Sequence, residues 1–157
     1  MIQVGDKIPA VGISKVQGGE TENISADQLV AGKKVVLFAL PGAFTPTCSA
    51  SHLPGYVVKA DEFFAKGVDM IACLSVNDAF VMKAWAEAQN AEQITMVADG
   101  GADLTKALGL EMDSGAFGGI RSRRYAMIIE DGVVTALNVE APKAFEVSSA
   151  EAMLALL

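Results

Sequence analysis

Short apolar runs that alternate with helix-forming segments constrain the fold of this chain more than any other feature. The runs at residues 34–40, 68–76 and 94–98 have the length and composition of buried strands. Each is followed by a segment with helical character, and a strand that returns to its sheet through a helix lies parallel to its predecessor. The order therefore predicts a sheet with parallel strands joined by right-handed crossovers.

Side chains that accept hydrogen bonds from free backbone N–H groups mark the expected helix starts. They are Ser25, Asp78 and Asp103. A further helix-forming segment, residues 48–65, contains the pair Pro54-Gly55, which predicts a kink or break within it. The last helix is expected over residues 148–157.

The two ends of the chain add further strands. Residues 8–16 are expected to form an edge strand, and the Gly-rich residues 112–120 are expected to be irregular. Residues 125–129 and 133–139 flank an Asp-Gly turn, which is a strong hairpin signal. Together the elements predict one α/β domain over residues 1–157, with a thioredoxin-like fold: a mixed central sheet with helices on both faces.

The composition suits a globular protein and argues against several classes of partner. Of the 157 residues, 52% are hydrophobic and 20% are charged, as in a domain with a packed core. The net charge of −7 argues against binding to nucleic acid or to an anionic membrane surface. No secretory signal and no apolar run of membrane-spanning length is seen, so the expected location is the cytoplasm, where thiols stay reduced.

The cysteines are too few to form a structural metal site. The chain has two cysteines, Cys48 and Cys73, and one histidine, and neither cysteine belongs to a C-x-x-C pair. No structural zinc set can be assembled from these residues, and no metal or cofactor is expected.

Cys48 is the first candidate functional residue. The apolar run 34–40 leads into a loop that contains Pro41 and Pro46, and helix-forming residues follow Cys48. The thiol is therefore expected at a strand-to-helix junction, where free backbone N–H groups and the helix dipole favour an anion. Such a thiol ionises more readily than one among apolar side chains and is a better nucleophile. The alternative is that Cys48 is a structural core thiol.

A cysteine that attacks a peroxide needs neighbours that stabilise negative charge. Thr45, three residues before Cys48, has a hydroxyl that can hydrogen-bond the sulfur or the peroxide. Three arginines lie within residues 121–124, and alternation along a strand predicts that Arg123 and Arg124 point in opposite directions. The residues alone leave open which of these two arginines faces a pocket. The alternatives are a turn hydroxyl for Thr45 and a solvated charge or a structural ion pair for Arg124.

His52 lies four residues after Cys48 on the same face of the expected helix. A Cys–His general-base pair is one interpretation of this spacing. We prefer a structural hydrogen-bonding role for His52, because a helix terminus and an arginine already account for a thiolate.

Three ordered blocks of the chain resemble the peroxiredoxins, which are thiol peroxidases with a thioredoxin-like fold. The active-site signature of that family is matched by Pro41-x-x-x-Thr45-x-x-Cys48. Longer stretches within residues 38–56, 73–85 and 124–134 resemble the peroxiredoxin-5 subfamily, also called type II. The resemblance extends over nearly the whole chain, and the order of the three blocks makes it specific.

The resemblance implies roles for particular residues. Cys48 would be the peroxidatic cysteine, which hydrogen peroxide and organic hydroperoxides oxidise to a sulfenic acid. Thr45 and Arg124 would bind the peroxide oxygens and stabilise the thiolate and the leaving oxygen, and Pro41 would shield the sulfur. Arg124 is preferred over Arg123 by its position in the family pattern.

Cys73 has two interpretations. Its place in the middle of the apolar run 68–76 favours a buried core residue. A disulfide needs Cα atoms within about 7 Å, which a strand centre and a helix start reach only through local unfolding. Plant-type relatives leave a resolving role for Cys73 open, whereas the late resolving cysteine of animal-type members is absent, because no cysteine follows Val139. An external thiol, either glutathione with glutaredoxin or thioredoxin, is the expected reductant.

The subfamily resemblance also implies a homodimer built near the active-site loops. Four apolar residues are candidates for that surface, although ordinary core packing is the simpler interpretation for most of them: Phe44, Phe80, Met112 and Phe117.

The predicted function is that of an antioxidant thiol peroxidase that contributes to cell redox homeostasis. A general thiol–disulfide oxidoreductase is one rival, and the missing C-x-x-C pair argues against it. The other rival is a redox-sensing or holdase-like interaction protein, in which oxidation of Cys48 only switches a surface.

Overall fold

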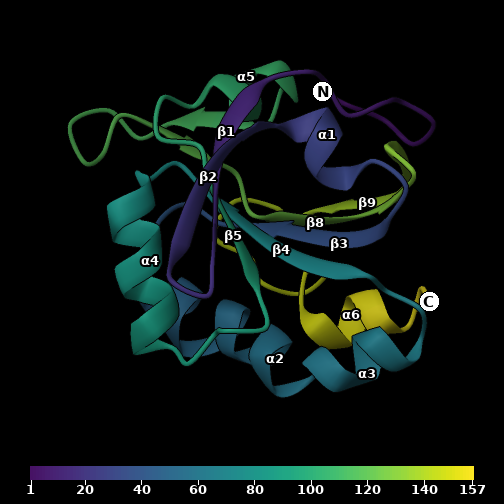
Figure 1. The fold of residues 1–157 in the computed structure, drawn as a ribbon. Coiled ribbons are helices and arrows are strands. Elements are labelled where there is room, and N and C mark those ends of the chain that lie inside the picture. Colours follow the sequence, from purple (N-terminus) through teal and green to yellow (C-terminus); the bar gives the residue numbers. More distant parts are fainter.

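A seven-stranded mixed sheet forms the centre of the computed structural model, which describes residues 1–157 (Figure 1). Its three middle strands run parallel, and the strands on either side pair antiparallel. In sheet order the strands are β2 (Glu20–Ser25), β1 (Gly12–Gln17), β5 (Thr95–Ala98), β4 (Met70–Ser75), β3 (Lys34–Ala39), β8 (Tyr125–Glu130) and β9 (Val133–Val139). The predicted thioredoxin-like fold, a mixed sheet with helices on both faces, is confirmed.

Two hydrophobic cores lie on opposite faces of this sheet. Alternation along β3 sends Val36 and Phe38 into one core and Val35 and Leu37 into the other. Tyr56 stacks on Phe38 with ring centroids 3.9 Å apart, which ties its helix to β3. The first core is covered by α2 (Leu53–Val58), α3 (Ala60–Ala65), α4 (Ala79–Ala88) and α6 (Ala150–Leu154), and the second by α1 (Ala26–Val30) and α5 (Asp103–Ala107) (Figure 1). None of these helices has the length and apolar character needed to cross a membrane.

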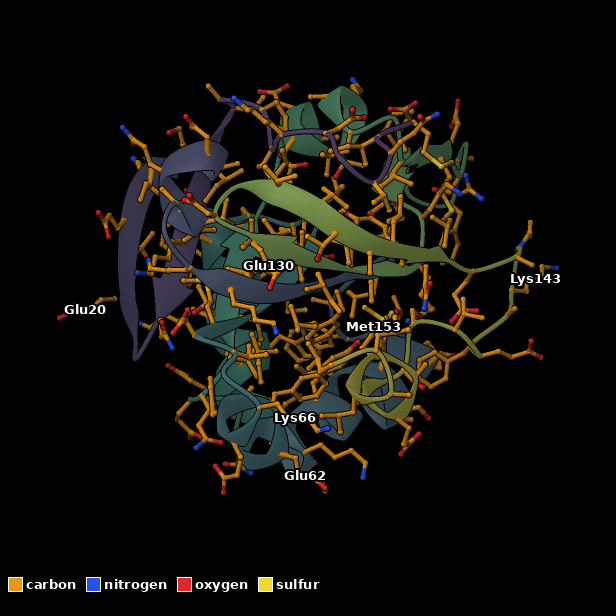
Figure 2. All side chains as sticks on the ribbon, turned by 90° about the vertical axis from the view of Figure 1, so that its right-hand side faces the viewer. Glu20, Glu62, Lys66, Glu130, Lys143 and Met153 are labelled. Carbon is orange, nitrogen blue, oxygen red and sulfur yellow. The ribbon has the colours of Figure 1, made fainter.

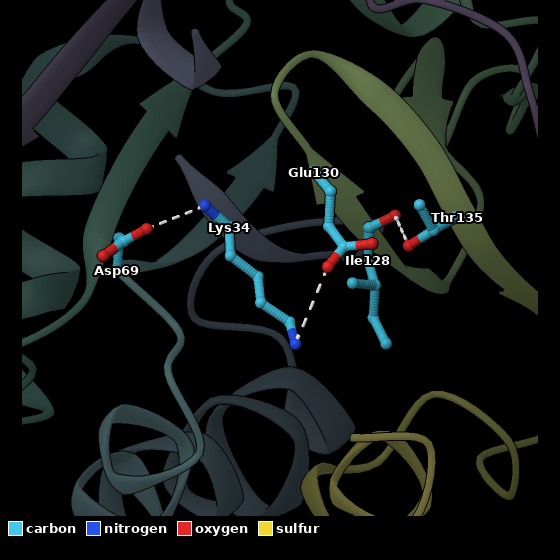
Figure 3. A network of polar contacts seen from close by, with 5 residues as sticks. All are labelled: Lys34, Asp69, Ile128, Glu130 and Thr135. Carbon is cyan, nitrogen blue, oxygen red and sulfur yellow. Dashed lines mark hydrogen bonds and ion pairs between the residues drawn. The ribbon is translucent and has the colours of Figure 1, made fainter. Parts of the chain in front are cut away.

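Polar contacts at the start of β3 fix how this strand lies against its neighbours (Figure 3). The backbone N–H of Lys34 donates to Asp69 Oδ2 at 2.9 Å, and Lys34 Nζ lies 3.8 Å from Glu130 Oε1 at the end of β8. Thr135 Oγ1 donates to the Ile128 carbonyl at 3.3 Å, beside the point where the register of β8 and β9 shifts. With its start held in this way, β3 delivers the loop that follows it to a defined place at the other end of the sheet.

The expected edge strand over residues 8–16 is wrong in two respects. The strand β1 begins at Gly12, and it is not an edge, because it pairs with β5 on one side and with β2 on the other. Gly18 and Gly19, both with positive φ, turn the chain back into β2, which is the true edge. Most of β2 is exposed and polar, so it lacks the apolar pattern by which strands are recognised.

The expected helix caps are partly confirmed. Asp78 Oδ1 accepts from the N–H of Val81, as predicted, at 2.9 Å. Ser25 precedes α1, but its side chain makes no capping bond. Asp103 does not cap α5, because it lies inside that helix. The N–H groups of Leu104 and Thr105 donate instead to the Asp99 carboxylate at the end of β5, at 3.1 and 2.7 Å.

The helical segment after residue 47 breaks at a different place from the one predicted. It opens with the π-helical turn η1 (Cys48–His52), and α2 then continues through Pro54-Gly55. Pro54 is tolerated because it falls in the first turn of α2, where its missing N–H is not needed. The break comes at Lys59, whose φ of −100° and ψ of 10° separate α2 from α3.

The C-terminal third contains more structure than expected at one point and less at another. Residues 112–120, expected to be irregular, form most of a small antiparallel hairpin of β6 (Glu111–Asp113) and β7 (Ile120–Ser122). The β8–β9 hairpin is confirmed, with Asp131 and Gly132 both at positive φ in its turn. The last helix, α6, ends at Leu154 rather than at residue 157.

Candidate active site

Cys48 stands where β3 leads into a helix. Ala39 ends β3, and the N–H of Ser49 donates to the Thr45 carbonyl at 2.9 Å, which closes the first helical turn. Cys48 begins the π-helical turn η1 and has no exposed surface. Single π-helical turns occur frequently at functional sites. The thiol therefore lies at a strand-to-helix junction but is enclosed in the first core.

Arg124 is the cation beside this sulfur. It directly precedes β8, and Tyr125 at the start of β8 pairs with Ala39 at the end of β3. This antiparallel register sets Arg124 next to the active-site loop. Its Nη2 donates to Cys48 Sγ at 3.1 Å, and its Nη1 donates to His52 Nδ1 at 2.7 Å. A guanidinium in direct contact with the sulfur stabilises negative charge there.

His52 holds the guanidinium and stays neutral. Burial, together with the charge of Arg124, lowers the pKa of His52 from 6.5 to about 3. Its Nδ1 accepts from Arg124, so Nε2 carries the proton and donates to the Ser148 carbonyl at 3.0 Å. Both ring nitrogens are occupied, and neither is free to take a proton from Cys48. The contacts therefore match a hydrogen-bonding role for His52.

Glu140 holds in place the segment whose Ser148 carbonyl accepts the hydrogen bond from His52. Its carboxylate accepts from the N–H groups of Glu146, Val147 and Ser148 and from the Ser148 hydroxyl, at 2.7–3.0 Å. Burial raises the pKa of Glu140, but these hydrogen bonds outweigh it and lower that pKa below its usual value. The ionised carboxylate of Glu140 thus holds residues 146–148 in place, and the carbonyl of Ser148 in turn orients the His52 ring. Sequence reasoning missed Glu140, because no local pattern connects it with the helix that carries His52.

Thr45 and Pro41 lie in the loop that follows β3. The Thr45 hydroxyl donates to the Gly42 carbonyl at 2.7 Å, so its hydrogen is engaged within the loop. The N–H of Ala43 donates to Asn77 Oδ1 at 3.0 Å, which ties the loop to the end of β4. The Thr45 oxygen keeps its capacity to accept a hydrogen bond.

Arg121 braces the same loop from β7. Its Nη1 donates to the Pro41 carbonyl at 2.8 Å, and its guanidinium lies over the Phe117 ring, 5.6 Å from the centroid. Gly42 and Gly118 make room for it, since a Cβ on either would lie only 2.0 or 2.2 Å from an Arg121 nitrogen. Sequence reasoning gave Arg121 no role of its own. The only signal was its place in the run of arginines before β8.

Alternation predicted that Arg123 and Arg124 point in opposite directions, with only one of them at a pocket, but both residues line the same cavity. The strand β8 begins only at Tyr125, so the two arginines lie before the alternating backbone. Both line a cavity of about 540 Å³ that also touches Pro41 and Thr47. Only Arg124 reaches the sulfur.

Cys73 lies on the same face of the sheet as Cys48 but is not bonded to it. It faces the first core from the middle of β4, where it pairs with Phe38, and both cysteines are free and buried. Burial, and then the charge of Cys48, raise the pKa of the Cys73 thiol well above its usual value. Cys73 is thus held as a thiol, which is a poor nucleophile.

Two further observations concern the surroundings of the site. No three His, Cys, Asp or Glu side chains come together as metal ligands.

The core-packing interpretation is wrong for Phe44, Phe80 and Phe117, which are exposed by 56%, 85% and 82%. These three apolar side chains are uncovered in the single chain.

Comparison with known proteins identifies the family. The Redoxin family model matches residues 3–154. The chain is 53% identical over 163 residues to Peroxiredoxin-2E-2, chloroplastic, of Oryza sativa subsp. japonica, in an alignment that covers 99% of this chain and 72% of that protein. The chain belongs to the peroxiredoxins. It is also 49% identical to Peroxiredoxin-2D of Arabidopsis thaliana, over 99% of this chain and 98% of the relative.

Solved peroxiredoxin structures share this fold. Reduced Prx3 of Vibrio vulnificus in complex with H₂O₂ superposes with a TM-score of 0.96 at 64% identity and covers 99% of both chains. Peroxiredoxin 5 of Alvinella pompejana gives a TM-score of 0.85 at 36% identity, over 99% of this chain and 97% of that one. The resemblance to the type II peroxiredoxins is therefore confirmed, and the protein is a thiol-dependent peroxidase.

Proposed function

We propose that this peroxiredoxin reduces hydrogen peroxide and small organic hydroperoxides through Cys48 and is recycled by an external thiol. The thiolate attacks one oxygen of the peroxide, the O–O bond breaks, and the other oxygen leaves with a proton as water or an alcohol. Cys48 becomes a sulfenic acid. One thiol converts it to a mixed disulfide with release of water, and a second thiol then frees Cys48.

The contact between Arg124 Nη2 and Cys48 Sγ, at 3.1 Å, carries this proposal. The positive charge of Arg124 stabilises the thiolate before attack. The remaining N–H groups of its guanidinium stabilise the negative charge that develops on the leaving oxygen. Thr45 accepts a hydrogen bond from the peroxide O–H with its free lone pair, and Pro41 shields the sulfur. Loss of one such donor costs about 10²–10³ in rate in other enzymes.

The reductant is proposed to be external because Cys73 is poorly placed to act. Its thiol is buried in the centre of β4, and burial raises its pKa. Glutathione with glutaredoxin, or thioredoxin, is the proposed source of the thiol. A disulfide between Cys73 and Cys48 would require one of the two segments to open locally.

The exposure of three large apolar side chains, Phe44, Phe80 and Phe117, supports a homodimer. Sedimentation of wild type and of Phe80→Ser tests it. A wild-type monomer at micromolar concentration would contradict the dimer. The cytoplasmic location stays a prediction.

A single-turnover experiment tests the central step. Trp85 is a suitable reporter, because its indole N–H donates to Ser49 Oγ at 3.0 Å, next to Cys48. Stopped-flow fluorescence after mixing with one equivalent of hydrogen peroxide is expected to show a fast change in wild type and none in Cys48→Ser. Mass spectrometry is expected to find the sulfenic acid on Cys48. Peroxide consumption by Cys48→Ser at the wild-type rate would refute the proposal.

A further inference from the structure

A cavity of about 540 Å³ lies beside the buried sulfur. Its walls include Pro41, Thr47 and Arg124, together with residues 140–144 that follow β9. This volume lies within the range of small-molecule binding sites. Thr47 directly precedes Cys48, and Arg124 is bonded to its sulfur, so a molecule in the cavity contacts the residues that border the reacting atom.

The walls of this cavity carry more positive than negative charge, since Arg123, Arg124 and Lys143 face a single carboxylate, that of Glu140. Arg123 and Lys143 line it, and neither side chain makes a hydrogen bond or an ion pair. The two ion pairs of the molecule lie elsewhere, at Lys34–Glu130 and Lys59–Glu62. The one carboxylate among the lining residues, that of Glu140, accepts from the backbone of residues 146–148, and these neutral N–H groups leave its negative charge in place. Three cations against one carboxylate therefore leave the lining with a positive surplus.

This charge runs against the composition of the whole protein. The net charge of the chain is −7, yet Arg123, Arg124 and Lys143 gather at one concave surface. A hollow in which one sign of charge predominates focuses its field and concentrates ligands of the opposite sign. Figure 2 shows Lys143 on a loop that projects from the body of the protein, so its ammonium meets molecules that arrive from solvent.

We infer that this hollow, the cationic cavity, binds the carboxylates of the small thiol that reduces oxidised Cys48. The inference rests on the proposed function, since it needs a sulfenic acid on Cys48. Arg123 offers a planar fork that matches a carboxylate, and Lys143 offers a compact charge at the mouth. Hydrogen peroxide is smaller than the cavity and has no carboxylate, so these two cations have no use in its binding.

The chemistry that follows is balanced by two molecules of thiol. The thiolate sulfur of the bound molecule attacks the sulfenic sulfur of Cys48. An S–S bond forms, the S–O bond breaks, and the hydroxide takes a proton and leaves as water. A second thiolate attacks the mixed disulfide, so that Cys48 returns as a thiolate and the two small thiols leave as a disulfide.

The test uses the full chain, first oxidised by one equivalent of hydrogen peroxide and then mixed with a small thiol. Glutathione carries two carboxylates, whereas its diethyl ester carries none and keeps the thiol. The rate of reduction of oxidised Cys48 is followed by Trp85 fluorescence and is divided by the concentration of the added thiol that is ionised. It is measured for wild type, Arg123→Gln, Lys143→Gln and the double variant. Lys66→Gln is the control, because Lys66 lies well away from Lys143 (Figure 2).

Each substitution in the cavity is expected to slow glutathione about two- to fivefold, as for one exposed ion pair, and the double variant about tenfold. The rates with the diethyl ester, the peroxide step and the Lys66→Gln control are expected to be unchanged. Added salt is expected to reduce the difference between wild type and variants, because exposed charges are screened.

Three results would overturn the inference. Equal slowing of glutathione and its ester would mean that the cavity does not recognise carboxylates. If the cavity variants reacted with glutathione at the wild-type rate but were oxidised more slowly by a carboxylate-bearing hydroperoxide, the cavity would be a site for the peroxide substrate. Absence of a sulfenic acid in the first step would remove the proposed function as well, and mass spectrometry records that outcome separately.

Discussion

The brace between Arg121 and the active-site loop gives a prediction that can be worked out from a single added methyl group. In Gly42→Ala the new Cβ would lie 2.0 Å from Arg121 Nη1 and 3.3 Å from its Cζ. Contacts below 3.0 Å do not persist, and the guanidinium is the mobile partner. It is therefore expected to swing away and to break its 2.8 Å bond to the Pro41 carbonyl.

A hydrogen bond to a charged group contributes about 1.5–3 kcal/mol net. If the bond holds Pro41 in the position needed for attack, its full loss slows oxidation of Cys48 about ten- to a hundredfold, since about 1.4 kcal/mol corresponds to a factor of ten. Arg121→Ala removes the same bond and is expected to cost the same. The double variant is then expected to be no slower than either single variant, because one interaction cannot be lost twice.

The assay is the second-order rate of the Trp85 fluorescence change on mixing with hydrogen peroxide. Urea denaturation of each variant shows whether the fold is retained. Gly12→Ala is the matched control, because a Cβ at Gly12 meets nothing within 4 Å. A wild-type rate for Gly42→Ala would refute the reasoning, and so would costs of Gly42→Ala and Arg121→Ala that simply add.

Three further outcomes are expected. The native state keeps His52 neutral down to a pKa of about 3, whereas the unfolded chain protonates it near 6.5, so its contribution to stability is complete above pH 6.5 and is lost as the pH falls toward 3. The free energy of unfolding is thus expected to fall by up to about 1.4 kcal/mol per pH unit in this window, and urea titrations of His52→Gln are expected to give a flatter profile; equal slopes would contradict this account. Glu140→Gln replaces the acceptor of five hydrogen bonds from four donor groups with an amide. It is expected to lose about 1–3 kcal/mol of unfolding free energy and to slow peroxide oxidation; a variant with wild-type stability and rate would show that Glu140 does not position the site. Cys73→Ala is expected to keep the wild-type turnover with glutathione as reductant, and a collapse of turnover would restore the resolving role of Cys73.

The parts of the site that follow from local sequence were predictable. The apolar run before Pro41 predicts β3, and the loop and helix-forming residues after it predict the junction that holds Cys48. The position of Arg124 does not follow from local sequence, because only the pairing of Ala39 with Tyr125 brings Arg124 to the sulfur. Alternation failed for Arg123 because the strand had not yet begun there.

The remainder depends on contacts between distant parts of the chain. Arg121 meets Pro41 across 80 positions, and His52 meets Ser148 across 96. Asp99 caps α5 from the end of a strand, where a local cap was expected at Asp103. Such partners leave no mark on the residues beside them, so a single sequence cannot reveal them.

The polar sequence of β2 makes this strand hard to predict, and it also affects how the edge of the sheet behaves toward other molecules. As one of the two outer strands of the sheet, it presents unpaired backbone N–H and C=O groups along one side. An apolar edge of this kind would recruit strands from other molecules and start an aggregate. Glu20 and Glu22 instead give it exposed negative charge. The polar sequence that lacks the apolar pattern of a strand therefore protects this edge of the sheet against strand-to-strand aggregation.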